Sequence, residues 1–262
     1  MVPTSHALLQ SLIRGPLLVG DLPEAAVFGR EALVLPDPVP CLNLEQKLGH
    51  LYEDALAVLL EASDRFELLS QNLSLRTDIH TTVGELDFLV RDLESSKLIH
   101  LELATKFYLA VETVDGLELP GPDARDNYFR KLHRLRSHQL RLASSHRDCL
   151  PEEYRDEPIL VRQLIYGCLF DHIRAIAPAV PPFSRSGCRR GRWLTVDECA
   201  DHFPPEARLQ VIPKPLWPVP LVFLGEVVLE PWVPPRSLDR CVMVRVDDGP
   251  IPYFVAPSGY PK

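Results

Sequence analysis

Several common signatures are missing from this chain of 262 residues, and each absence removes a class of protein. No apolar run approaches the roughly 20 residues that a membrane-spanning helix needs, which excludes an integral membrane protein of that kind. The six cysteines are scattered without a C-x-x-C pair, so we expect reduced thiols in a cytoplasmic protein. The N-terminus lacks a basic start and is interrupted by Arg14 and Pro16, which makes it a poor signal peptide.

Familiar catalytic and nucleotide-binding motifs are absent as well. The sequence contains no G-x-S-x-G, no Walker loop and no G-x-G-x-x-G, which argues against a serine hydrolase and against the common phosphate-binding loops. Cys188, Cys199 and His202 lack a fourth ligand and a zinc-knuckle spacing, so we do not expect a zinc site.

Composition and proline distribution divide the chain. A net charge of −8 argues against a protein that coats nucleic acid indiscriminately, although it allows a local basic groove. Sixteen of the 26 prolines lie between residues 178 and 261, where no long helix is expected. We therefore predict an N-terminal extension with one short helix over 1–40, a core over 41–176, and a Pro-rich extension of short strands and loops over 177–262. Its expected strands are 221–224, 226–229 and 241–246.

Hydrophobic periodicity in the middle segment predicts a helix over 43–62 with Asn43 as N-cap, then strands near 73–75, 83–91 and 97–111. Two more helices are predicted over 123–143 and 159–176. This order indicates an α/β or α+β fold with a mixed sheet.

Two acids are predicted to face each other in this sheet. The connection over 92–96 is short and polar, so the flanking strands should form an antiparallel hairpin. A turn between Glu94 and Ser95 places Asp87 directly opposite Glu102, with Glu85 on the same face as Asp87. Like charges so placed are destabilising, and carboxylate oxygens suit a hard divalent cation, Mg²⁺ or Mn²⁺.

Two further residues belong with this pair. The helical phase directs Glu53 towards apolar cover, where an unpaired charge is costly, and the cation is its available partner. Lys106 shares the strand face of Glu102. The alternative is that Asp87, Glu102 and Lys106 form salt bridges on a solvated face of the sheet.

The predicted helix over 123–143 is the most basic part of the chain. Between Arg125 and Arg147 there are seven Lys or Arg and three His residues against one acid, Asp126. Such a local field suits phosphates, although a charge run is also typical of a solvated helix face. The basic stripe predicted on this helix comprises Lys131, Arg134, His138 and Arg141. A second and weaker candidate for phosphate contacts comprises Arg185, Arg189, Arg190 and Arg192.

These segments resemble the bacterial domain-of-unknown-function family 1853, DUF1853, which is grouped with the PD-(D/E)xK nuclease-like superfamily. The resemblance covers about residues 48–142 and continues more loosely over 214–218 (KPLWP). The residues that carry it are 84–89 (GELDFL), 100–109 (HLELATKFYL), 121–126 (GPDARD), Lys131, Leu135 and 138–140 (HQL).

The resemblance implies a restriction-endonuclease-like core, with a mixed central sheet flanked by helices. It implies that Asp87 and Glu102 are metal ligands, that Glu53 is the first-helix glutamate, and that Lys106 orients or activates the attacking water. It also implies that Asp126, Lys131, His138 and Gln139 lie beside the metal site, near phosphate. The sequence departs from the pattern because no proline precedes the first acid, and because Ala104 stands where E-x-K would place the lysine.

Together these features predict a nuclease-like protein that hydrolyses phosphodiester bonds of DNA or RNA with a Mg²⁺-activated water. One alternative is a non-catalytic nucleic-acid-binding or regulatory protein on the same fold, favoured by the displaced lysine. Another is a structural scaffold whose polar strand face is only solvated.

Overall fold

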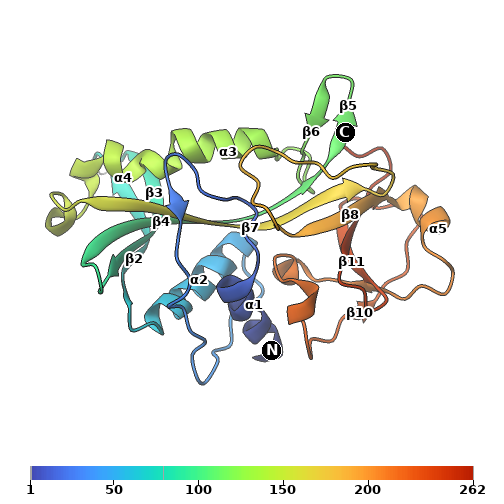
Figure 1. The fold of residues 1–262 in the computed structure, drawn as a ribbon, viewed down its shortest axis with the longest axis horizontal. Helices are drawn as coiled ribbons and strands as arrows, with labels where there is room; N and C mark the ends of the chain where they lie inside the picture. Colours follow the sequence, from blue (N-terminus) through green and yellow to red (C-terminus); the bar gives the residue numbers. More distant parts are fainter. Residues whose placement is uncertain (1, 79, 262) are drawn as a thin grey trace.

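The computed structural model describes residues 2–78 and 80–261, which form a large mixed sheet with helices on both faces (Figure 1). Neighbouring strands in the main sheet follow the order β10-β9-β11-β12-β8-β7-β4-β3-β2, and β1 pairs with β7. The strands are β1 (Ala26–Val27), β2 (Phe66–Arg76), β3 (Thr82–Asp92), β4 (Lys97–Leu109), β5 (Val111–Thr113), β6 (Gly116–Glu118), β7 (Ile159–His172), β8 (Arg190–Thr195), β9 (Leu209–Val211), β10 (Glu230–Pro231), β11 (Val242–Val246) and β12 (Pro252–Ala256).

Helices are fewer and mostly short. The α-helices are α1 (Val2–Arg14), α2 (Leu48–Glu61), α3 (Tyr128–Ser137), α4 (Leu142–Ser145) and α5 (Cys199–His202). The 3₁₀ helices are η1 (Gln139–Arg141), η2 (Arg147–Cys149), η3 (Glu152–Tyr154), η4 (Val196–Glu198), η5 (Lys214–Leu216) and η6 (Leu221–Phe223). The fold is thus α+β with a mixed sheet, as predicted. No helix in the described part of the chain combines the length and the apolar character that crossing a membrane requires.

The predicted helix over 159–176 is wrong, because this segment is the long strand β7. β7 pairs in parallel with β4 from Leu98–Ile159 to Leu109–Phe170, and it is buried on both faces from Gln163 to Asp171. A strand covered on both faces shows a continuous apolar run instead of alternation, and such a run imitates a buried helix.

Helix boundaries also differ from the prediction. Lys47, and not Asn43, precedes α2, and no side chain caps that end. The predicted basic helix over 123–143 is broken: α3 begins after Asn127, whose side chain accepts from two backbone N–H groups, and it ends at His138. The backbone of His138 is not helical, and a 3₁₀ turn and the short α4 follow it, so the periodic stripe does not continue past α3.

Side chains on the two faces of β4 enter different cores, as the predicted alternation requires. Leu101, Leu103 and Phe107 join the large cluster formed with α1 and α2. Ala104 and Tyr108 lie on the other face, in the cluster under α3. α1 and α2 therefore cover one face of the sheet, while α3 and α4 cover the other (Figure 1).

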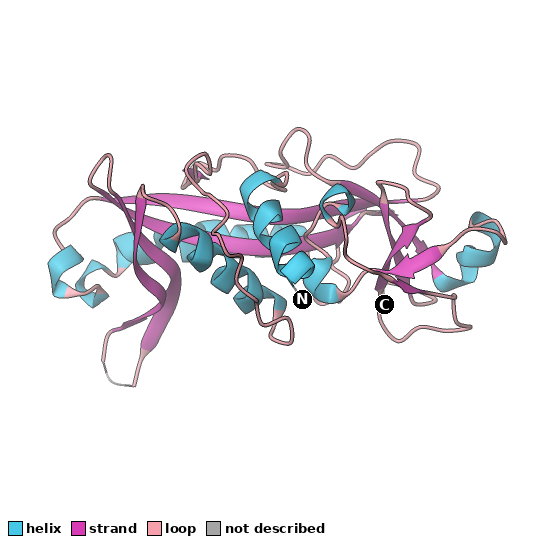
Figure 2. Cartoon of the chain, turned by 90° about the horizontal axis from the view of Figure 1, so that it is seen from below, coloured by secondary structure: helices cyan, strands magenta, loops and turns pink. Residues whose placement is uncertain are grey.

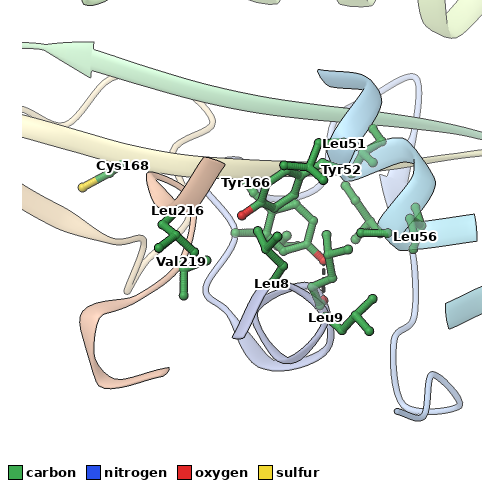
Figure 3. Packing of buried hydrophobic residues seen from close by; sticks show 14 of the residues in the cluster. Leu8, Leu9, Leu51, Tyr52, Leu56, Tyr166, Cys168, Leu216 and Val219 are labelled. Carbon is green, nitrogen blue, oxygen red and sulfur yellow. Dashed lines mark hydrogen bonds between the residues drawn. The ribbon is translucent and has the colours of Figure 1, made fainter. Parts of the chain in front are cut away.

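The N-terminal and C-terminal segments contribute to the same large core. Figure 3 shows the close packing of labelled side chains from α1, α2, β7 and the C-terminal third, namely Leu8, Leu9, Leu51, Tyr52, Leu56, Tyr166, Cys168, Leu216 and Val219. The boundaries at residues 40 and 176 remain a prediction. In the C-terminal third the strand over 241–246 is confirmed as β11, whereas 221–224 is largely the 3₁₀ helix η6 and 226–229 is loop.

The register of the β3–β4 hairpin is confirmed. Asp92 pairs with Lys97, and the ladder continues to Phe88–Leu101, which places Asp87 and Glu102 next in register. There the described ladder ends. Asn72, which falls opposite Asp87 between two pairs of the β2–β3 ladder, has a φ of 53°, and both strands turn away from β4 (Figure 2).

Gly167 in β7 provides a test of the tight β4–β7 pairing. Its φ is 151°, and an added Cβ would lie 1.6 Å from the carbonyl oxygen of Lys106. We expect Gly167→Ala to lower the free energy of unfolding by about 3 kcal/mol or more, from backbone strain plus overpacking. Gly187→Ala is the matched control, because its φ is 77° and an added Cβ meets no described atom within 4 Å. Equal losses for the two variants in urea unfolding would contradict this account.

Candidate functional site

Asp87 lies where β3 separates from β4. Its Oδ2 accepts a hydrogen bond of 2.8 Å from the backbone N–H of Leu103. The carboxylate thus takes the place of a strand carbonyl at the end of the ladder, which satisfies a backbone donor that has lost its partner strand. This bond fixes the position of the Asp87 side chain at the point where β3 separates from β4, which we call the fork.

Glu102 is held from two sides in the interior. The residue is 2% exposed, its Oε1 lies 2.7 Å from Nε2 of His100, and its Oε2 accepts from the side-chain amide of Gln139 at 3.2 Å. His100 is itself fully buried. Buried carboxylates are retained where such hydrogen bonds fix them, so the orientation of Glu102 is set before any ligand arrives.

The two carboxylates lie close enough to perturb titration. Burial, together with the charges of Glu102, Glu53 and Glu85, raises the pKa of Asp87 to about 8, while the N–H of Leu103 acts in the opposite direction. Burial disfavours the charged form, and neighbouring like charges add to that effect. The predicted juxtaposition of Asp87 and Glu102 is therefore present, and it carries an electrostatic cost.

Glu53 reaches the same region from α2. Its side chain is 13% exposed and its Oε2 lies 3.1 Å from Nδ1 of His50. Glu85, by contrast, is exposed and accepts a hydrogen bond from Ser74 on β2. The structure thus brings Glu53, Asp87 and Glu102 together and leaves Glu85 at the surface nearby.

A cavity of about 600 Å³ opens beside the fork. We call it the cleft. On one side α3 and η1 form its wall, on the other the start of α2 and η5 do, and the open edge of β4 lies between them. Its lining includes Leu48, Gly49, Glu53, Asp87, Glu102, Leu103, Ala104, Thr105, Lys106, Phe107, Tyr108, Asp126, Lys131, Leu132, Arg134, Leu135, Gln139, Lys214 and Trp217.

Lys106 lines the cleft, but its charged neighbours are not the acid pair. Burial lowers the pKa of Lys106 and the charge of Lys131 adds to that effect, while Asp126 opposes it. Ala104, at the position where E-x-K places the lysine, lines the cleft as well. Lys106 therefore sits further along β4, as the sequence spacing predicts.

Part of the predicted basic stripe lies elsewhere. Lys131, Arg134 and Gln139 line the cleft, whereas His138 and Arg141 do not belong to its lining. Arg141 lies 3.7 Å from Glu24, which also pairs with Arg136. The helical period ends at His138, so the spacing that predicted His138 and Arg141 on the same stripe no longer applies there.

The second basic cluster does not join the cleft either. Arg189 is buried, and Arg190 forms an ion pair with Asp171. The structure instead adds Lys214 and Trp217, which the sequence linked to the site only through the loose resemblance over 214–218. His100 lies two residues before Glu102 on β4, so alternation puts both on one face, but no pattern in the sequence revealed that they would be in contact.

The donors at the fork suit a hard cation that is shared with a substrate. Within residues 2–78 and 80–261, no three His, Cys, Asp or Glu side chains are grouped to hold a metal ion by themselves. Mg²⁺ is commonly held by one or two carboxylates, with water and substrate phosphate completing its ligands. Asp87 and Glu102 fit that partial set of ligands.

The raised pKa of Asp87 predicts a pH-dependent stability. Because its folded pKa of about 8 lies above the unfolded value of 3.8, the folded state binds the proton more tightly. This contribution to stability is fully present below pH 3.8 and is lost as the pH rises towards 8. We expect Asp87→Asn, which can still accept from Leu103, to gain stability over the wild type by on the order of a few kcal/mol between pH 5 and 8. Parallel unfolding profiles for the two proteins across this range would contradict the assignment.

Comparisons with known proteins identify the family of this chain. No match was found among proteins of curated function or among solved structures. A family model described as Domain of unknown function (DUF1853) matches residues 31–240, a span that contains the fork and the helices of both walls of the cleft. Because this match covers well over half of the sequence, the chain belongs to the DUF1853 family.

Proposed function

We propose that this chain is a metal-dependent phosphodiesterase of the PD-(D/E)xK type that acts on nucleic acid. The observation that carries the proposal is the layout of the cleft. Three carboxylates, Glu53, Asp87 and Glu102, converge near the fork, and the same cavity is lined by cationic side chains. Acids that hold a divalent ion beside cations that bind phosphate are what hydrolysis of a phosphodiester requires. Those cations are Lys106, Lys131, Arg134 and Lys214.

In this proposal Asp87 and Glu102 hold Mg²⁺ or Mn²⁺, and Glu53, which is not grouped with them closely enough to be a third ligand, holds water of the ion. When bound, the ion would lower the pKa of water and offset charge on the phosphate. His100 and Gln139 keep the two oxygens of Glu102 in place. The electrostatic cost of the acid pair supports the assignment, since a cation between the carboxylates would relieve it.

Lys106 has a role further along the cleft. Its ammonium is desolvated and lies under the influence of Asp126 and Lys131, so it favours an anionic group as a partner. A nucleic-acid strand that runs from the fork along β4 would bring its phosphates near Lys106 and Lys131. Lys106 would thus stabilise negative charge on a phosphate of the substrate beside the reacting one.

A non-catalytic nucleic-acid-binding protein is the second candidate. The specific observation in its favour is that both oxygens of Glu102 already have hydrogen-bond partners, His100 and Gln139. In addition, the described charges around Lys106 are Asp126 and Lys131, and not the acid pair. In this candidate the cations of the cleft bind phosphate and the acids have no part in hydrolysis.

Asp87→Asn separates the two candidates. We expect the wild type to bind Mn²⁺ in calorimetry, to gain thermal stability with Mn²⁺ at pH 8, and to cleave nucleic acid. The asparagine variant should lose both effects of the ion, with hydrolysis reduced by about 100-fold or more. Glu85→Gln is the matched control, because this acid lies two residues away on the same strand but is exposed. Hydrolysis by Asp87→Asn at the wild-type rate would reject the proposed role of Asp87, and the absence of Mn²⁺ binding to the wild type would favour the second candidate.

The broken helix predicts which cations contact nucleic acid. We expect Lys131→Gln and Arg134→Gln each to weaken binding and to reduce the slope of log affinity against log salt by about 1. Arg141→Gln should leave both quantities unchanged, because Arg141 lies near Glu24 outside the lining of the cleft. Equal effects of the three substitutions in a salt titration would contradict this prediction and would support the continuous basic stripe that the sequence predicted.

A further inference from the structure

The size of the cleft limits what can reach the acids. Glu102 is 2% exposed, and the cavity that leads to it measures about 600 Å³. That volume lies within the range of about 300–1,000 Å³ typical of pockets that enclose a small organic molecule. A cavity of this size takes a short segment of one strand and is too small to enclose a duplex.

An aromatic ring is fixed in the wall of this cleft. Trp217, just after η5, is half-buried, and its indole N–H donates to the carbonyl of Ile212 at 2.9 Å. Its ring meets Phe107 and Phe254 in T-shaped contacts, with centroid distances of 5.6 and 4.8 Å. The indole is therefore positioned in advance, so a ligand that stacks on it does not have to order it.

A buried arginine anchors the backbone of the same residue. Arg189 is 8% exposed, and its guanidinium donates to the carbonyl of Trp217. Burying a guanidinium without a carboxylate partner is costly, and burial lowers the pKa of Arg189. This hydrogen bond from Arg189 holds the end of η5 in place, and thereby the wall of the cleft.

Cations lie on both walls of the cleft that holds this ring. Lys214 is exposed, lines the cleft, and has its Nζ 5.9 Å from the centre of the Trp217 ring. Lys131 and Arg134 line the opposite wall on α3. A base stacked on Trp217 would therefore place a flanking phosphate near Lys214, in a part of the cleft that Asp123 and Asp126 also line.

We infer that the cleft takes an unpaired strand of nucleic acid, with one base stacked on Trp217 and a neighbouring phosphate on Lys214. The inference rests on the proposed function for its ligand class and adds the substrate form. Stacking platforms combined with basic side chains are how proteins bind single strands without reading sequence.

Binding of fluorescein-labelled 12-nucleotide probes tests the inference by anisotropy, in EDTA so that no probe is cleaved. The probes are a single strand of DNA, a single strand of RNA, and the blunt DNA duplex of the same sequence. We expect a single strand to bind at least tenfold more tightly than the duplex. Trp217→Leu should weaken that binding roughly tenfold and Trp217→Phe less, since phenylalanine retains a stacking face.

Two further variants keep the test decisive if Trp217→Leu fails to fold. Lys214→Gln changes an exposed side chain, and it should weaken single-strand binding and reduce the salt slope by about 0.7. Trp232→Leu is the matched control, because Trp232 is half-buried outside the cleft, and it should bind as the wild type does.

Equal or tighter binding of the duplex would overturn the inference. So would unchanged single-strand affinity in both Trp217→Phe and Lys214→Gln, which would leave Trp217 as a core residue only. Hydrolysis is measured separately with Mg²⁺. Single-strand preference without cleavage would support the inference and reject the proposed hydrolysis, while cleavage with equal affinity for the duplex would do the reverse.

Discussion

The hydrogen bond between the Asp87 carboxylate and the N–H of Leu103 marks the constraint on which the site depends. β4 pairs with β7 along nearly its whole length, whereas its pairing with β3 extends from the turn only as far as Phe88 and Leu101. A backbone donor left at such a fork needs an acceptor, and a side-chain carboxylate provides one. The departure of β3 exposes the edge of β4, and the cleft forms along that edge.

The two carboxylates of Asp87 and Glu102 repel each other, and the paired strands β4 and β7 hold them close together. Asp87 and Glu102 raise the free energy of the deprotonated site, and Glu102, which is 2% exposed, cannot relax by moving into solvent. The pairing of β4 with β7, both covered by helices, keeps the strand straight and the acids in place. Functional sites commonly carry such local costs, and the surrounding fold sustains them.

Local patterns were sufficient for the hairpin but not for its surroundings. The short polar turn fixed the register of β3 against β4, and alternation correctly assigned the faces of β4, because both depend on near neighbours in sequence. The same reasoning failed for β7 and for α3. A strand buried on both faces loses its period, and the end of α3 at His138 has no proline or glycine to announce it.

The sequence by itself determined the family, the mixed sheet, and the convergence of Asp87 with Glu102, since strand geometry leaves little freedom across a tight hairpin. Only the tertiary structure decided which cations share the cleft with these acids. Trp217 and Lys214 arrive from more than 100 residues away, held by Arg189 and by packing against Phe107 and Phe254. Such contacts depend on how the whole core packs, and no local period in the chain encodes them.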